Sequence, residues 1–153
     1  MPKTVRCCEV QSHTVDTEGK IRFDAEILNH IIEQKNHCIK DYAYIFHDED
    51  RYTAADQEED PKHIEGELKP EHFHLFLRFE RDQPQQFADI AKWFDLKQEF
   101  VRKIKTTWED CIGYLVHQNH PDRHPYSPDD IVANFDVAKI LKKAAEKSTG
   151  KLQ

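Results

Sequence analysis

Two histidines separated by one residue lie in the most regular β pattern of the chain, HFHLFLRF at residues 72–79. Successive side chains of a strand point to opposite faces of a sheet, so one face of this stretch is entirely apolar. That face consists of Phe73, Leu75, Leu77 and Phe79, and we expect helices to cover it. His72 and His74 lie on the other face, about 7 Å apart by the usual rise of a strand, which allows both rings to bind one metal ion. Such a pair also arises by chance, so it does not identify a site alone.

A third histidine and a carboxylate follow another aromatic strand pattern. Residues 41–47 read DYAYIFH and lead directly into the acidic cluster HDED. By the same alternation His47 points away from Phe46, and Asp50 follows where the chain turns. A closed structural zinc site would include cysteine, and no cysteine is near in sequence. Three imidazoles and a carboxylate suit a divalent transition ion such as Mn²⁺, with Mg²⁺ also possible. The predicted ligands are His47, Asp50, His72 and His74.

A tyrosine with nucleophilic potential lies in the helical pattern WEDCIGYLVHQ at residues 108–118. The apolar stripe of this helix leaves Tyr114 on the polar side, near His117. A phenol has a pKa near 10, so it attacks poorly until a base or a nearby positive charge favours the phenolate. Tyr114 is therefore a nucleophile only if it faces the metal, and otherwise an ordinary surface tyrosine. His117 could orient this phenol or accept its proton, and otherwise it is a surface residue.

The remaining patterns predict the elements that position these side chains. Asp24 can cap a helix over residues 25–34, and residues 51–69 are polar and predict a loop. The other expected elements are strands at 4–10, 41–47, 72–79 and 100–105 and helices at 84–94, 106–117 and 137–147. This order predicts an α+β fold, a ferredoxin-like sandwich with a mainly antiparallel sheet. We expect the helices on one face and the metal site on the other, open face.

The charge pattern allows a local basic surface on an acidic protein. The 153 residues carry a net charge of −7, with seven acids concentrated in residues 48–60. Four cations are candidates for contacts with DNA phosphates, although each could equally be a solvated side chain: Arg78, Arg102, Lys103 and Lys105. No apolar run approaches the roughly 18 residues that span a bilayer, and the N-terminus lacks a signal-peptide pattern. We therefore expect a cytoplasmic protein.

Three motifs in order resemble a known family. The segments FHDED, EHFHLFLRF and YLVHQNHPDRHPYSPDDI are similar to the replication initiators of small rolling-circle plasmids of Gram-positive bacteria, in the HUH endonuclease superfamily. The resemblance runs from about residue 40 to residue 135. It implies that His72 and His74 are the paired metal ligands and that His47 and Asp50 complete the set. It also implies that Tyr114 cuts DNA and stays bonded to the 5′ phosphate.

The resemblance implies a function for the whole chain. Origin DNA, single-stranded or extruded as a hairpin, would be nicked at one site on one strand, leaving a 3′ hydroxyl that primes rolling-circle replication. Residues 1–125 would form the nicking and origin-binding domain, and residues 126–153 a C-terminal helical extension. Homo-oligomers would form through segments outside this chain.

Three rival interpretations stay open at the level of sequence. The first is a single-tyrosine transposase or relaxase, although relaxases usually carry a third histidine close to the first two, which HFHLF lacks. The second is a non-enzymatic, metal-stabilised DNA-binding module, which would bind origin DNA without a covalent adduct. The third is a two-histidine phosphoesterase, which would need two H-x-[ST] motifs that His72 and His74 do not supply.

Overall fold

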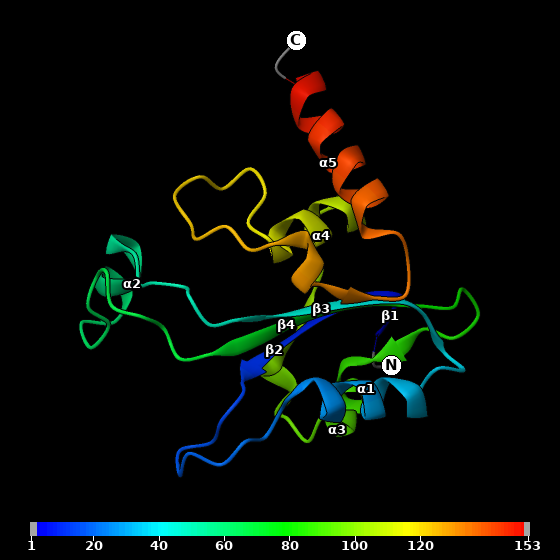
Figure 1. The fold of residues 1–153 in the computed structure, drawn as a ribbon. Helices are drawn as coiled ribbons and strands as arrows, with labels where there is room; N and C mark the ends of the chain where they lie inside the picture. Colours follow the sequence, from blue (N-terminus) through cyan, green and yellow to red (C-terminus); the bar gives the residue numbers. More distant parts are fainter. Residues whose placement is uncertain (1–2, 152–153) are drawn as a thin grey trace.

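A five-stranded antiparallel sheet forms the centre of the fold (Figure 1). The computed structural model describes the backbone of residues 3–151 and the side chains of residues 3–146. Across the sheet the strands are β6 (Val101–Lys103), β2 (Cys7–His13), β4 (His72–Phe79), β3 (Ile39–His47) and β7 (Val132–Ala133). The predicted strand over residues 72–79 is therefore confirmed, and it lies in the middle of the sheet between β2 and β3.

The chain order confirms the predicted fold class. Helix α1 (Ala25–Gln34) connects β2 to β3, and α3 (Phe87–Trp93) connects β4 to β6. This β-α-β-β-α-β succession, with all neighbouring strands antiparallel, is the ferredoxin-like arrangement. A separate two-stranded sheet pairs β1 (Thr4–Val5) with β5 (Gln85–Gln86). The strand predicted over residues 4–10 is therefore divided between β1 and β2, and the helix predicted over residues 84–94 begins later, at Phe87.

The predicted apolar face of β4 is confirmed. Asp24 caps α1 by accepting a hydrogen bond from the Ile27 amide at 2.9 Å, and this helix buries Leu28 and Ile32. Helix α3 buries Ile90 on the same side of the sheet. The strand side chains beneath both helices are fully buried: Phe73, Leu75, Leu77 and Phe79.

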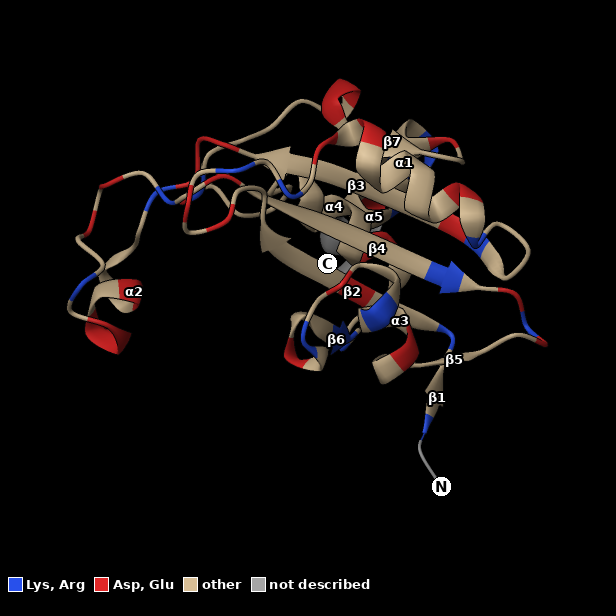
Figure 2. Cartoon of the chain, turned by 90° about the horizontal axis from the view of Figure 1, so that it is seen from below, with Lys and Arg blue, Asp and Glu red and all other residues tan. Residues whose placement is uncertain are grey.

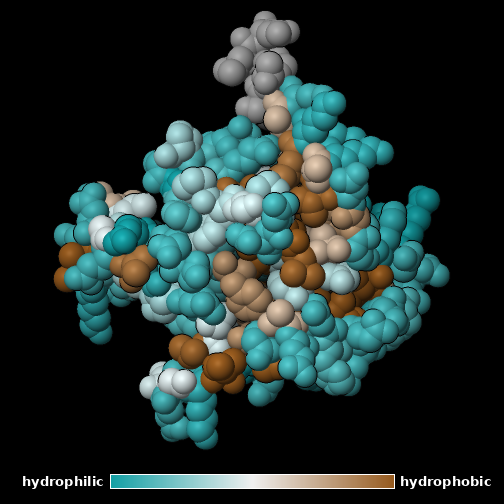
Figure 3. Space-filling model, viewed as in Figure 1, coloured by the Kyte–Doolittle hydropathy of each residue, from teal (hydrophilic) through white to brown (hydrophobic). Residues whose placement is uncertain are grey.

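Helices also cover the other face of the sheet, where the sequence analysis expected an open surface. Helix α4 (Trp108–Leu115) lies on this face and α5 (Val137–Lys151) packs against it (Figure 1). The reason is apolar area on both sides, because Ile45 and Phe76 on the sheet meet Ile112 on α4 in a second core. The metal-ligand cluster lies at one end of this covered face. Figure 3 shows apolar surface between the base of α5 and the sheet.

An arm formed by residues 51–69 projects from one end of the sheet (Figure 1). The sequence predicted a loop here, but the arm contains helix α2 (Ala54–Glu59), whose first turn is closed by a capping box between Thr53 and Asp56. A bridge between Arg51 and Leu68 closes the base of the arm. Two short 3-10 turns, η1 (Gln98–Phe100) and η2 (Pro128–Asp130), complete the elements. Among the described residues, no helix has the length and apolar character needed to cross a membrane.

Candidate active site

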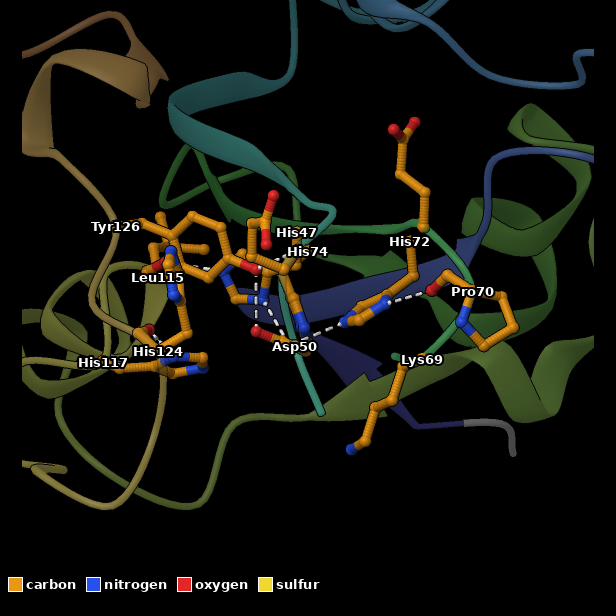
Figure 4. A network of polar contacts seen from close by, with 12 residues as sticks. His47, Asp50, Lys69, Pro70, His72, His74, Leu115, His117, His124 and Tyr126 are labelled. Atoms are coloured by element: carbon orange, nitrogen blue, oxygen red, sulfur yellow. Dashed lines mark hydrogen bonds and ion pairs between the residues drawn. The ribbon is translucent and has the colours of Figure 1, made fainter. Parts of the chain in front are cut away.

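The four predicted ligands lie together at one end of the sheet (Figure 4). His47 ends β3 and pairs in register with His72 on β4, while Asp50 returns from the following turn. One ligand atom from each residue lies within 4.8 Å of the others: His47, Asp50, His72 and His74. All four are buried, which differs from the open site expected, because α4 and the loop after it lie over the cluster.

Each histidine has one ring nitrogen held by an acceptor. His47 Nε2 lies 2.7 Å from the Leu115 carbonyl, and His72 Nδ1 lies 2.9 Å from the Pro70 carbonyl. His74 Nδ1 lies 2.8 Å from the carboxylate of Glu9. These oxygens only accept, so the nitrogens that face them carry the proton. In the neutral rings, the remaining nitrogens therefore have lone pairs available to a metal, as in many metal sites.

Two of those lone pairs point at the same carboxylate oxygen. Asp50 Oδ2 lies 3.1 Å from His47 Nδ1 and 3.2 Å from His72 Nε2. Burial would raise the pKa of Asp50, but hydrogen bonds from His47 and His72, when these two nitrogens carry a proton instead of a lone pair, outweigh it and hold the pKa far below its usual range. An ionised carboxylate facing two lone pairs is repulsive unless a proton or a cation lies between them. The donor set thus fits a divalent cation.

His74 is suited to be a ligand because it stays neutral. Burial lowers the pKa of His74 to about 4, although the hydrogen bond that His74 donates to Glu9 acts in the opposite direction. Metal binding requires the neutral imidazole. At neutral pH, Nε2 of His74 therefore offers its lone pair to the cluster.

Tyr114 on α4 lies directly beside this cluster. Its half-buried ring stands edge-on to the ring of His74, with 5.7 Å between the centroids and an interplanar angle of 85°. Burial raises the pKa of Tyr114, while the positive charges of Arg123 and Arg102 act to lower it. The phenol is therefore protonated at neutral pH and needs further positive charge or a proton acceptor to attack.

His117 supplies an acceptor nitrogen close to that phenol. Its ring lies 5.5 Å from the Tyr114 ring and 4.8 Å from the His47 ring, between centroids. Nδ1 donates to the His124 carbonyl at 2.7 Å, and the buried Nε2 has no hydrogen-bond partner among the described residues. Burial lowers the pKa of His117, which favours the neutral ring. The residue also has a φ of 57°, a left-handed conformation that costs energy outside glycine and is enriched at functional sites.

Two residues at the site were given no role by the sequence. Tyr126 stacks on His47, with 4.2 Å between ring centroids and an interplanar angle of 6°. Its hydroxyl donates to Asp50 Oδ1 at 2.8 Å and accepts from the Glu49 amide at 2.9 Å. Glu9 on β2 holds His74. Alternation places Glu9 on the polar side of its strand, but the register between β2 and β4 is not visible in the sequence, and Tyr126 lies in an aperiodic loop.

The four cations predicted to contact DNA fall into two groups. Arg102, Lys103 and Lys105 are exposed and line a cavity that also contains Tyr114. Arg78 differs, because its Nη2 lies 2.7 Å from Asp41 Oδ2 and its guanidinium lies over the Trp108 ring. Since Arg78 is held within the fold, we leave it out of the proposed DNA surface.

Two comparisons with known proteins each cover most of this chain. A family model described as the origin binding domain of plasmid replication proteins matches residues 25–138, a range that contains the cluster and Tyr114. A "Replication protein" of Onion yellows phytoplasma (strain OY-M) is 35% identical over 133 residues, which cover 86% of this chain and 33% of that protein. The chain thus spans about a third of the length of this relative.

Proposed function

Because the chain belongs to the origin binding domain family of plasmid replication proteins, we propose that it initiates replication by nicking one strand of the origin through Tyr114. The proposal adds cleavage of one DNA strand to the origin binding that defines the family. The observation that carries it is the position of the Tyr114 ring, 5.7 Å from the His74 ring of a buried cluster that can hold a divalent ion. A nucleophile beside a metal site is an arrangement that supports metal-assisted phosphodiester transfer.

The proposed reaction is a transesterification. The phenol oxygen of Tyr114 loses its proton and attacks the scissile phosphorus, the bond from phosphorus to O3′ breaks, and the released O3′ takes up a proton from water. The products are a 5′-phosphotyrosyl link and a free 3′ hydroxyl that can prime synthesis. A divalent ion on His47, Asp50, His72 and His74, Mn²⁺ by preference or Mg²⁺, would polarise the phosphoryl group and offset its charge. Because the phosphodiester energy stays in the protein–DNA bond, the strand can later be rejoined.

His117 is the proposed acceptor for the phenol proton. Its Nε2 is buried and unpartnered among the described residues, and its ring is edge-on to Tyr114. The hydrogen bond from Nδ1 to the His124 carbonyl fixes the tautomer in which Nε2 accepts. The same nitrogen can instead orient the phenol by accepting its hydrogen bond.

The proposed partner is plasmid origin DNA, single-stranded or extruded as a hairpin at the nick. Arg102, Lys103 and Lys105 provide positive charge next to Tyr114 for the phosphates on either side. Self-assembly into homo-oligomers would use segments outside these 153 residues.

The test is covalent capture of DNA. Single-stranded oligonucleotides that tile both strands of the plasmid origin are incubated with the protein and Mn²⁺, then separated by denaturing electrophoresis. We expect an adduct with one strand only, lost in excess chelator and restored by Mn²⁺. Tyr114→Phe should bind the same DNA without an adduct, and Tyr52→Phe on the arm should behave like the parent.

Three outcomes would contradict the proposal. Full cleavage in excess chelator would remove the metal requirement. An adduct in Tyr114→Phe would move the nucleophile elsewhere, with Tyr126 the next to test. Binding of origin DNA without an adduct under any divalent ion would identify a binding module instead.

A further inference from the structure

A cavity of about 650 Å³ begins at Tyr114 and extends away from the metal cluster. One wall is residues 102–106, the opposite wall is α4, and the floor is the surface of β2 and β4. Its volume lies in the range of small-molecule pockets and is far too small for a duplex. An unpaired base can therefore enter this cavity beside the nucleophile, whereas a duplex cannot.

The sheet register sets what lines the floor. Arg102 on β6 pairs with Glu9 on β2, and Glu9 pairs with Phe76 on β4, so these side chains form a row across one face. In the adjacent row on this face, Gln11 pairs with His74. Side chains directly opposite one another lie about 5 Å apart. Gln11 therefore lies next to His74, a predicted metal ligand, and it also lines the cavity.

The cavity combines apolar atoms with positive charge. Phe76 and Cys111 line it but are almost fully buried, so each offers only a small apolar area, whereas Arg102, Lys103 and Lys105 are exposed. These three cations form no ion pair with any residue that the structure describes. Aromatic or apolar surface flanked by cations is the combination that binds unpaired nucleotides.

Gln11 is a free hydrogen-bonding group in the lining of this cavity. Glu9 is occupied by His74, and Asp110 accepts a hydrogen bond from Thr106 at 2.9 Å. The side-chain amide of Gln11 forms no hydrogen bond within the described part of the chain, and it is half-buried at the cavity edge. An amide offers a donor and an acceptor together, a pair that matches the N6 and N7 edge of adenine.

We propose that this cavity binds an unpaired nucleobase next to the scissile phosphate, with Gln11 contacting its edge in preference for adenine and Arg102 contacting a neighbouring phosphate. This inference rests on the proposed function and adds a specificity site to it. It requires the strand to be unstacked at the nick, which single-stranded or hairpin DNA permits.

The test measures DNA binding rather than cleavage. Fluorescein-labelled single-stranded dA12, dC12 and dT12 and a 12-base-pair duplex are titrated with the protein, and anisotropy is followed at several salt concentrations. We expect the parent to bind dA12 most tightly and the duplex least. Gln11→Ala should lose about tenfold in affinity for dA12 and little for dT12. Arg102→Ala should weaken all three single strands similarly and reduce the salt slope by about one.

Matched controls lie on the opposite side of the sheet. Gln34→Ala on α1 removes the same amide group, and Lys92→Ala on α3 removes a positive charge, from exposed positions, and both variants should bind like the parent. The proposal is overturned if Gln11→Ala keeps the parental ratio of dA12 to dT12 affinity, or if the parent binds none of the single strands. The binding test involves no cleavage, so the two proposals can fail separately. A preference for dA12 that depends on Gln11, without any covalent adduct on origin DNA, would contradict only the proposed nicking. An adduct together with an unchanged ratio of dA12 to dT12 affinity in Gln11→Ala would contradict only the proposed base-binding cavity.

Discussion

His47 shows how single residues prepare this site. Its Nε2 is held by the Leu115 carbonyl, and its ring is clamped on the other side by the Tyr126 ring. These contacts fix both the tautomer and the ring plane, so Nδ1 is directed at Asp50 before any ion binds. Groups behind a ligand that orient it in this way commonly change metal affinity by 10- to 100-fold.

Tyr126→Phe tests that role directly. The substitution keeps the ring that stacks on His47 and removes only the hydroxyl between Asp50 and the Glu49 amide. We expect Mn²⁺ affinity, measured by calorimetry on chelator-treated protein, to fall by about 10- to 100-fold. His74→Ala, which removes a ligand, should lose more.

The matched control for this prediction is Tyr52→Phe. Tyr52 also stacks on a histidine, His63, with 4.3 Å between ring centroids, but on the projecting arm. The Tyr52→Phe variant should bind Mn²⁺ with the affinity of the parent. Parental affinity in Tyr126→Phe would show that the hydroxyl does not position Asp50.

At the scale of residues, the sequence predicted the site residues whose side-chain direction is set by a single strand or helix. Alternation along two strands was enough to place His47, His72 and His74 on one face, and the resemblance singled out Tyr114. Glu9 and Tyr126 depend on contacts between elements distant in the chain, which no local pattern encodes.

At the scale of elements, β4 divides its side chains between two tasks. Leu75 is fully buried beneath the helices, whereas His72 faces the cluster. Leu75→Ala should therefore lower the free energy of unfolding by about 2–5 kcal/mol through the cavity it leaves. His72→Ala should change it far less in metal-free buffer, because it removes a side chain that faces an ionised carboxylate. Urea unfolding in chelator checks this, and the opposite ranking would contradict the assigned roles of the two faces.

Tyr44 on β3 should make the fold sensitive to alkaline pH. Burial raises the pKa of Tyr44 to about 12, and its hydroxyl donates to Asn29 on α1 at 2.7 Å. The unfolded phenol ionises near pH 10, so the stabilisation is fully present below pH 10 and is lost as the pH rises through about 12. Tyr44→Phe should thus be less stable at pH 8 but lose less stability between pH 10 and 12. Equal slopes of urea midpoint against pH in the two proteins would contradict this.

The sequence analysis misjudged two features of the fold, the helix in the arm and the covered second face, and each has its own reason. Helix α2 is short and polar, and its capping box is the local feature that marks it. The second face of the sheet is covered because the apolar stripe of α4 packs on Ile45 and Phe76. The sequence shows the apolar stripe, but it does not show this packing. Periodicity reports that a helix has an apolar side but not which face of the sheet that side meets.

At the scale of the whole molecule, acidic and basic side chains are concentrated in different places. The net charge is −7, and Figure 2 shows acidic residues on α2 and through the projecting arm. The cations at the cavity beside Tyr114 lie on β6 and the residues after it. An acidic protein can therefore still present positive charge where a DNA strand would meet the nucleophile. The sequence showed this separation along the chain, while the fold shows that the basic segment borders the site.

The most direct test of the account is to find which end of the DNA stays with the protein. An origin oligonucleotide carrying one dye at its 5′ end and another at its 3′ end is cleaved in Mn²⁺ and resolved by denaturing electrophoresis. Attack by Tyr114 with release of O3′ predicts that the 3′ label migrates with the protein. The 5′ label should appear in a short free oligonucleotide that a polymerase can extend. Retention of the 5′ label on the protein, or release of both labels as free fragments, would contradict tyrosine transesterification as the function of this chain.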